Sequence, residues 1–267
     1  MPFADLGDVR LFYTDDNAEA AGPPVLLVHG FGADSGDWDP HIADLATDQR
    51  VIAPDLRGHG HSSAPASGYR PRDFAGDLVR LLDRLGIERV SAFGHSMGAV
   101  VVSALAVEHP HRVSALVCVD PGYGQPPEIA AAFPAMIEGL RTDAHATALA
   151  NDAWCYTPAT PPYVRTSHAR KILATPPHAL AESFAGMFSG ADQFCLRPAA
   201  DHYLARRECP VLSCWSAARS ASATWEAGLF KHPASTTLSW PGAGHRLHEE
   251  RPAEFLLVAK DWLTSLG

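Results

Sequence analysis

The sequence has little positive charge. Its 267 residues include 21 lysines and arginines against 30 aspartates and glutamates, which gives a formal net charge of −9. A chain with this balance repels phosphate-rich surfaces, so we expect neither nucleic acid nor an anionic membrane among its partners. Hydrophobic residues make up 46% of the chain and charged residues only 19%. This composition predicts a folded protein with a sizeable core and argues against disorder.

Cysteine is also scarce, and no two cysteines form a CxxC pair. The five are Cys118, Cys155, Cys195, Cys209 and Cys214. An odd number without paired spacing predicts reduced thiols and favours a cytoplasmic protein. The first stretch, MPFADLGDVRLFYTDD, has early acidic residues and no long apolar run. We therefore expect neither a secretory signal nor a membrane anchor.

Motifs for cofactors and metals are missing as well. The chain contains no G-x-G-x-x-G loop of the kind that holds dinucleotide phosphates. His59 and His61 have no partners at metal-ligand spacing, and with Asp55 they belong to a loop that we expect to shape the fold. Asp34, Asp37 and Asp39, close to Trp38, are expected in a solvated loop with one aromatic residue packed inward. We predict a protein that uses no cofactor and no metal.

Apolar runs alternate with amphipathic stretches over most of the chain. Strands are expected within residues 9–16, 23–34 and 50–65, and the spacing of Phe74, Leu78, Leu81, Leu82 and Leu85 predicts a helix. Residues 89–110 are expected to form a short strand, a turn and a helix, further strands are expected within 112–122, 209–215 and 235–245, and a closing helix is expected at 252–266. Strands that are apolar on both faces and alternate with helices predict a parallel sheet covered on both sides.

The alternation stops between about residues 122 and 208. This segment is rich in alanine, proline and histidine and contains helical stretches such as PEIAAAFPAMIEGL. We interpret it as an inserted helical lid. The predicted organisation is therefore a core made of residues 1–121 and 209–267, with a lid at 122–208.

The most specific motif lies between an expected strand and an expected helix. It is Gly94-His95-Ser96-Met97-Gly98, a G-x-S-x-G sequence. At a sharp strand-to-helix turn the serine hydroxyl projects outward, and the small residues on either side allow the backbone to approach closely. The helix start adds free N–H groups and a positive dipole end. We predict that Ser96 is a nucleophile.

A second motif, HGFGAD, follows the strand that begins at Pro23. Its backbone N–H at Phe31, together with that of Met97, is placed to stabilise an oxyanion. Gly30 and Gly32 of the same turn are expected beside the substrate.

A serine hydroxyl needs a base of near-neutral pKa within hydrogen-bond reach. His245 follows a strand and a Gly-x-Gly loop and precedes the last helix, so we favour it as this base. His248 is expected to point elsewhere, and His95 is too close to Ser96 in sequence to accept its proton.

Together, LLVHGFG, APDLRGHGHS, GHSMGA and PGAGH…RP resemble the α/β-hydrolase family over nearly the whole chain except the lid. The resemblance implies an eight-stranded, mostly parallel sheet flanked by helices, with serine, acid and histidine in that chain order. Most members place the acid after the seventh strand. Here the corresponding turn is WSAAR, with Arg219 where the acid would stand, and the first carboxylate is Glu226.

We therefore look for the acid elsewhere. Asp120 ends the apolar run ALVCV, 24 residues after Ser96, and the carboxyl ends of parallel strands line the ligand crevice. We predict that Asp120 orients His245, with a turn-capping role for Asp120 or use of Glu226 as the alternatives. Acid placement after strand six is similar to that in zearalenone-type lactonases, which the chain also resembles in its serine and its length.

These residues predict a carboxylic ester hydrolase that acts on a small apolar ester or lactone through an acyl-enzyme on Ser96. Trp154 and Trp215 are the expected aromatic substrate contacts. Three alternatives remain open: a cofactor-free dioxygenase that uses the histidine–aspartate pair as its base, a ligand-binding member of the fold without catalysis, and a carbon–carbon bond hydrolase, whose relatives usually keep the acid after strand seven. A homodimer is compatible with the sequence, which does not specify the oligomeric state.

Overall fold

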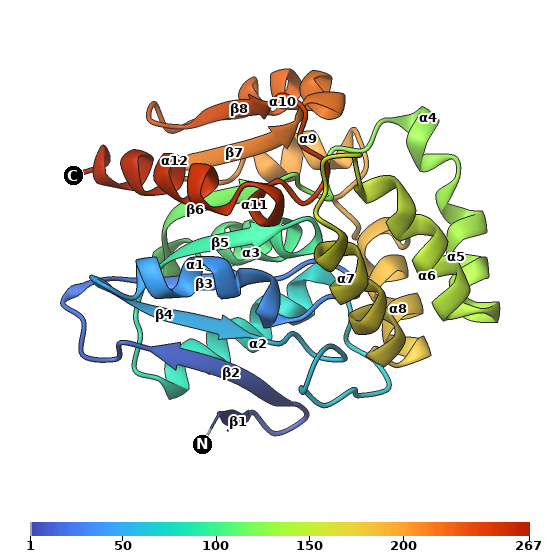
Figure 1. Cartoon of the computed structure of the whole chain (residues 1–267), viewed down its shortest axis with the longest axis horizontal. Helices are drawn as coiled ribbons and strands as arrows, with labels where there is room; N and C mark the ends of the chain where they lie inside the picture. The colour runs from blue at the N-terminus through green and yellow to red at the C-terminus, as the bar shows by residue number, and fades with distance from the viewer. Residues whose placement is uncertain (1) are drawn as a thin grey trace.

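The computed structural model describes residues 2–267, and one mixed sheet runs through its middle (Figure 1). In this range the sheet has eight strands in the order β1-β2-β4-β3-β5-β6-β7-β8. Their bounds are β1 Phe3–Asp5, β2 Arg10–Asp16, β3 Gly22–Val28, β4 Gln49–Pro54, β5 Val90–His95, β6 Val113–Val119, β7 Val211–Ser216 and β8 Thr236–Trp240. The pairs β1–β2 and β2–β4 are antiparallel, and the remaining pairs are parallel. The predicted eight-stranded, mostly parallel sheet is confirmed.

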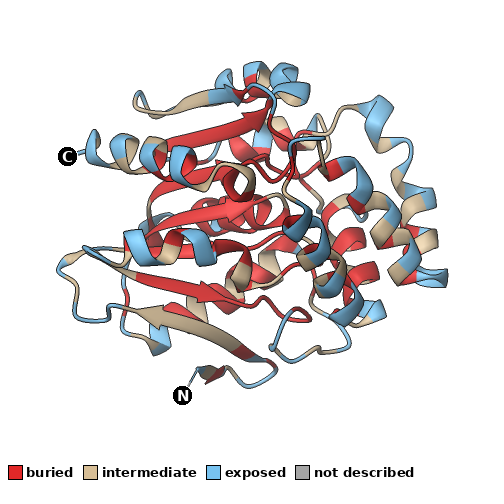
Figure 2. Cartoon of the chain, viewed as in Figure 1, coloured by how far each residue is buried: buried red, intermediate tan, exposed pale blue. Residues whose placement is uncertain are grey.

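The central strands are buried on both faces (Figure 2). Every residue of β5 and of β7 is buried, and β6 has one partly exposed residue. This is why these strands are continuous apolar runs and not alternating ones. The register pairs His95 with Val119 and Val119 with Cys214. The residues that follow β5, β6 and β7 therefore emerge together at one edge of the sheet.

Helices cover both faces. On one face α1 (Asp39–Leu45) and α12 (Pro252–Thr264) pack over a cluster that includes Trp38 and Phe255. The other face is covered by α2 (Pro71–Arg84), α3 (Met97–Glu108) and α10 (Ser220–Ala227). The buried residues of α2 include Phe74, Leu78, Leu81 and Leu82, as the spacing predicts. Short elements complete the core: η1 Ser35–Trp38, η2 Pro110–Arg112, η4 Ala217–Arg219 and α11 Leu247–Glu250.

A helical segment is inserted between β6 and β7. It contains α4 Pro127–Ala130, α5 Phe133–Thr142, α6 Ala144–Asp152, η3 Ala153–Cys155, α7 Pro162–Ala174, α8 Pro177–Phe188 and α9 Ala199–Leu204. Helices α5 to α8 lie beyond the end of the sheet toward which the parallel strands point (Figure 1). The last helix, α9, differs because its Tyr203 hydroxyl donates to Glu108 of core helix α3. The division at residues 122 and 208 stays a prediction.

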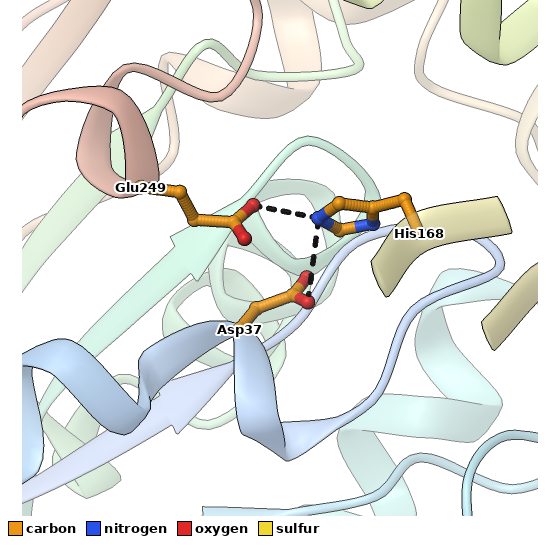
Figure 3. Close-up of side chains that lie close together, drawn as sticks. All are labelled: Asp37, His168 and Glu249. Carbon is orange, nitrogen blue, oxygen red and sulfur yellow. Dashed lines mark hydrogen bonds and ion pairs between the residues drawn. The ribbon is translucent and has the colours of Figure 1, made fainter. Parts of the chain in front are cut away.

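A buried polar cluster joins α7 to the core (Figure 3). Nε2 of His168 lies 2.8 Å from Oε1 of Glu249 and 3.6 Å from Oδ1 of Asp37, and Nζ of Lys171 lies 2.6 Å from the same Asp37 oxygen. Asp37 is fully buried, so the expectation of a solvated position is wrong for this residue, whereas Asp34 is partly exposed and Asp39 is exposed. The reason is that α7 covers this loop and supplies a cation. Trp38 packs inward as expected.

None of the helices in residues 2–267 combines the length and the apolar character that crossing a bilayer requires.

Candidate active site

Ser96 occupies a strained turn between β5 and α3. Its φ of 51° and ψ of −110° are rare for a residue with a side chain and are sustained only by the surrounding structure. The glycines on either side allow this turn, because a Cβ at Gly94 would lie 2.4 Å from backbone atoms of Gly98. A Cβ at Gly98 would lie 2.2 Å from the carbonyl oxygen of Val28. The predicted strand–turn–helix context of the G-x-S-x-G motif is present.

Asp120 and His245 are brought together at the adjacent edge of the sheet. Oδ2 of Asp120 lies 2.6 Å from Nδ1 of His245, and both residues are buried. Asp120 follows β6, and His245 lies in the loop after β8. Because Asp120 accepts a hydrogen bond at this position, neutral His245 carries its proton on Nδ1. Its Nε2 is then free to accept a proton.

The carboxylate of Asp120 is held by the turn after β7. Its Oδ1 accepts hydrogen bonds from the backbone N–H of Ser216 at 2.9 Å and from the Ser216 hydroxyl at 3.2 Å. Burial alone would raise the pKa of Asp120, but the Arg219 charge and the hydrogen bond from His245 outweigh it and lower the pKa below its ordinary value. Asp120 is therefore an anion at neutral pH.

His245 is neutral under the same conditions. Burial lowers the pKa of its imidazole below the ordinary value of 6.5, and the hydrogen bond that Nδ1–H donates to Asp120 offsets this only in part. The charges of Arg246 and Arg219 lower the pKa further. A neutral imidazole whose Nδ1 proton is engaged by a carboxylate can act as a general base at Nε2.

Ser96 and His245 line the same cavity, which has a volume of about 630 Å³. Within residues 2–267 the Ser96 hydroxyl makes no hydrogen bond to His245. In sites without substrate such contacts are commonly long and tighten when substrate binds. Of the three residues predicted to work together, the structure joins two by a hydrogen bond and places the third in the shared cavity.

The loop after β3 closely approaches the elbow. A Cβ at Gly30 would lie 2.9 Å from Nδ1 of His95 and 3.4 Å from Cβ of Ser96, so only glycine fits there. Phe31 lines the cavity, and Met97 is the first residue of α3, whose N–H has no partner within the helix. Gly32 packs below the inserted segment, where its Cβ would lie 3.0 Å from Ile172. Neither glycine lines the cavity itself, but both lie against residues that do, so their place beside a substrate stays a prediction.

The rest of the cavity wall is largely apolar and comes mainly from the inserted segment. It includes Ile129, Phe133, Trp154, Ile172, Phe184, Met187 and Phe188. The Trp154 ring lies 4.7 Å from the His245 ring and remains 56% exposed. Phe133 and Met187 were not singled out from the sequence, because helices in this segment carry apolar residues on several faces.

The expectation for Trp215 is wrong. Its side chain is fully buried, and its indole Nε1 donates to Oε2 of Glu226 at 2.9 Å. The same glutamate accepts from Arg207 at 3.0 Å and from Tyr123 at 2.5 Å. Because β7 is buried on both faces, nothing in its sequence indicates which side chains face the cavity. Glu226 is fully engaged in this separate network, away from His245.

Four charged residues also line the cavity: Glu128, Asp152, Arg219 and Arg246. Arg246 pairs with Asp152 of α6 at 2.5 Å, which ties the inserted segment to the residue next to His245. No local pattern indicates this pair, because 94 residues separate its members.

Asp37, His168 and Glu249 could offer one ligand atom each to a metal ion, and these atoms lie within 4.8 Å of one another. The Lys171 ammonium already contacts Asp37 at 2.6 Å and competes with a metal for that carboxylate. Burial raises the pKa of Asp37, but the charges of His168 and Lys171 outweigh it and lower the pKa. We interpret the cluster as an ion-pair network between α7 and the core.

Comparison with known proteins agrees with this architecture. The model of the α/β hydrolase fold family matches residues 23–154, just under half of the chain. The chain has the α/β-hydrolase fold, and its elbow, cavity and histidine–aspartate pair lie at the carboxyl edge of the sheet.

Two solved structures illustrate the similarity. The enol-lactonase from Burkholderia xenovorans has a TM-score of 0.85 and 25% sequence identity, with 98% of this chain and 100% of that chain covered. A thermophilic esterase from Thermogutta terrifontis has a TM-score of 0.82 and 26% identity, with 98% and 96% covered.

Curated relatives match over shorter stretches. The dihydrolipoyllysine-residue acetyltransferase component of an acetoin cleaving system from Cupriavidus necator is 40% identical over 123 residues, which is 46% of this chain and 32% of that protein. Epoxide hydrolase 3 from Siraitia grosvenorii is 43% identical over 99 residues, 36% of this chain and 31% of that protein. The matched parts therefore span about a third of these two relatives.

Proposed function

We propose that the protein is a serine hydrolase that cleaves carboxylic esters, with apolar esters or lactones as its substrates. The observation that carries this proposal is the 2.6 Å hydrogen bond between Asp120 and His245 at a cavity that Ser96 also lines. A second support is the strained turn at Ser96, because such strain is characteristic of functional positions. The similarity to an esterase and an enol-lactonase agrees with this class of reaction.

In the proposed reaction, Nε2 of His245 takes the proton from the Ser96 hydroxyl as its oxygen attacks the ester carbonyl. Asp120 keeps the imidazole in the right tautomer and stabilises the imidazolium that forms. The backbone N–H groups of Phe31 and Met97 stabilise the oxyanion of the tetrahedral intermediate. His245 then returns the proton to the leaving alcohol, and water releases the acid by the same steps.

The cavity supports an apolar substrate of moderate size. Its volume of about 630 Å³ falls within the range of roughly 300–1,000 Å³ that is common for small-molecule sites. Its aromatic and aliphatic wall favours a hydrophobic acyl or macrocyclic group over a highly charged one.

The test is hydrolysis of p-nitrophenyl esters and of a lactone panel that includes a resorcylic macrocyclic lactone. We expect turnover by the wild-type protein and none above background by Ser96→Ala. Ser222→Ala is the matched control, because Ser222 lines the same cavity without lying at the elbow. Equal turnover by wild type and Ser96→Ala would remove Ser96 from the reaction.

The histidine–aspartate pair also fits the alternative of cofactor-free oxygenation, in which it would act as a base toward an N-heteroaromatic substrate. This alternative predicts oxygen consumption with a hydroxyquinolone-type substrate. It also predicts that Ser96→Ala retains this activity. A non-catalytic receptor would bind ligands but would not be labelled by a fluorophosphonate at Ser96.

A further inference from the structure

Arg219 contacts the turn that carries Asp120. It is the last residue of η4, directly after β7. Its Nη1 donates to the carbonyl oxygen of Pro121 at 2.7 Å and to that of Asp120 at 3.3 Å. The same Nη1 lies 3.7 Å from Oδ2 of Asp120, the oxygen that contacts His245. One guanidinium nitrogen therefore contacts both the backbone and the carboxylate side of this turn.

The Asp120 turn requires such support. Asp120 has a φ of 38°, in the left-handed region that side chains beyond glycine rarely occupy. A residue held there costs roughly 1–3 kcal/mol and persists only when its neighbours fix it. Ser216 fixes the carboxylate by two donors to Oδ1. Arg219 holds the two backbone carbonyls that follow, so the two residues constrain different parts of the turn.

The guanidinium of Arg219 packs over the ring of Trp215. Its carbon atom lies 4.6 Å from the centre of the Trp215 ring, and the side chain is 15% exposed. Nη2 is buried and lacks a hydrogen-bond partner among residues 2–267. Arg219 also lines the cavity, but both hydrogen bonds of its guanidinium go to the Asp120 turn, so the geometry favours action on this turn over direct binding of a charged substrate group.

Charged and titratable groups reach His245 from every element packed around it. Asp120 approaches from the end of β6, Arg219 from η4, and His95 of β5 through a hydrogen bond to the His245 carbonyl oxygen. Arg246 is adjacent in the chain and is paired with Asp152 of α6. The Cys155 thiol belongs to η3, whose backbone accepts from the His245 N–H, and burial raises its pKa. In this set Arg219 is the cation that touches the Asp120 carboxylate.

We propose that Arg219 is a positioning residue that fixes the Asp120 turn and holds its carboxylate beside His245. The inference rests on the proposed function, because it assigns Arg219 a role through the residues that activate Ser96. Arginine is suited to this role because its planar, permanently charged fork makes several directed hydrogen bonds.

The test compares Arg219→Gln and Arg219→Lys with the wild-type sequence by two measurements. The first is the NMR titration of His245 in a Ser96→Ala background, which needs no catalysis. The second is the rate of fluorophosphonate labelling of Ser96 over a range of pH. Arg197→Gln is the matched control, since Arg197 donates to Gly124 and lies over Trp225.

We expect Arg219→Gln to move the His245 titration to higher pH, because a cation that opposes its protonation is lost. Labelling should slow by up to about a hundredfold, as expected for a misplaced catalytic group. Arg219→Lys should restore the titration and only part of the rate, because lysine keeps the charge without the fork. Arg197→Gln should change neither.

An unchanged titration and a labelling rate within about twofold of wild type in Arg219→Gln would overturn the proposal. If that variant does not fold, Arg219→Lys decides: a slower rate with an unchanged titration supports the proposal, and an unchanged rate overturns it. If wild-type Ser96 is not labelled and esters are not cleaved, the proposed function fails. The His245 titration still decides whether Arg219 acts on the pair.

Discussion

Nδ1 of His245 lies 2.6 Å from Oδ2 of Asp120, although 125 residues separate them in the chain. The contact arises because the parallel register of β5, β6 and β7 brings the ends of these strands to one edge of the sheet. His245 reaches the same edge from the loop after β8. The carboxylate that orients this histidine therefore follows the sixth strand, and the turn after the seventh strand supplies Ser216 and Arg219 to hold it.

The first prediction concerns the pH dependence of the reaction. A general base must be unprotonated, and burial lowers the pKa of His245 below 6.5 despite its hydrogen bond to Asp120. We expect kcat/KM for a p-nitrophenyl ester to be at its full value at pH 7. Below pH 6.5 it should fall as a single proton binds to His245. A midpoint above pH 7 would contradict this environment for His245.

The second prediction concerns Trp154, whose ring lies over His245 at the cavity wall. Burying an aromatic ring against a ligand contributes about 1.5–3 kcal/mol, so Trp154→Ala should lower kcat/KM for an apolar ester by about ten- to a hundredfold. Tyr163→Ala is the control, because Tyr163 is an equally exposed aromatic residue of the inserted segment outside the cavity wall. Equal effects of the two substitutions would exclude a specific contact by Trp154.

The third prediction concerns the cluster between α7 and the core. Asp37→Asn removes a fully buried partner of Lys171 and His168, and breaking such a buried pair costs about 3–5 kcal/mol. The free energy of unfolding, measured in urea, should fall by that amount. Arg70→Gln, which breaks an exposed pair with Asp192, should cost less than about 1 kcal/mol. Similar losses of unfolding free energy in both variants would show that the buried cluster stabilises the fold no more than an exposed ion pair does.

The fourth prediction concerns stability in acid. Burial lowers the pKa of His41 from 6.5 to about 4. Between pH 6.5 and 4, His41 therefore binds a proton in the unfolded chain but stays neutral in the folded protein. The stability that is present above pH 6.5 is lost as the pH falls toward 4. Each such histidine contributes a slope of up to about 1.4 kcal/mol per pH unit.

His41→Leu should therefore flatten the dependence of the unfolding free energy on pH between 6.5 and 4, as measured by urea denaturation at several pH values. His111→Ala is the control, because His111 is exposed. An unchanged slope in His41→Leu would show that His41 does not stay neutral in the folded protein.

Much of the fold can be predicted from the sequence, because its signals are local. The continuous apolar runs of β5 and β6 indicate buried parallel strands, and the spacing of Phe74, Leu78 and Leu81 indicates α2. Glycines on both sides of Ser96 mark the elbow, since no other residue fits the backbone contacts there. The end of a buried strand was enough to select Asp120 as a candidate.

Contacts between distant segments were not predictable in this way. His168 meets Glu249 across 81 residues, and Lys171 meets Asp37 across 134, without any local pattern. The orientation of Trp215 was mispredicted because a strand buried on both faces has no polar alternation that marks the cavity side. Arg219 stands where an acid after β7 would be expected, but its contact with the Asp120 turn depends on how η4 folds back.

The central claim is that Asp120 activates Ser96 through His245, and the rate of Ser96 acylation in Asp120→Asn tests it most directly. The amide keeps the shape of the side chain but cannot hold the right tautomer or offset the imidazolium charge, so we predict a loss of about 10⁴-fold at pH 7. Glu226→Gln, measured per folded molecule, should retain acylation because Glu226 belongs to the separate network around Arg207 and Trp215. A loss of less than about tenfold in Asp120→Asn, or a large loss confined to Glu226→Gln, would contradict the account.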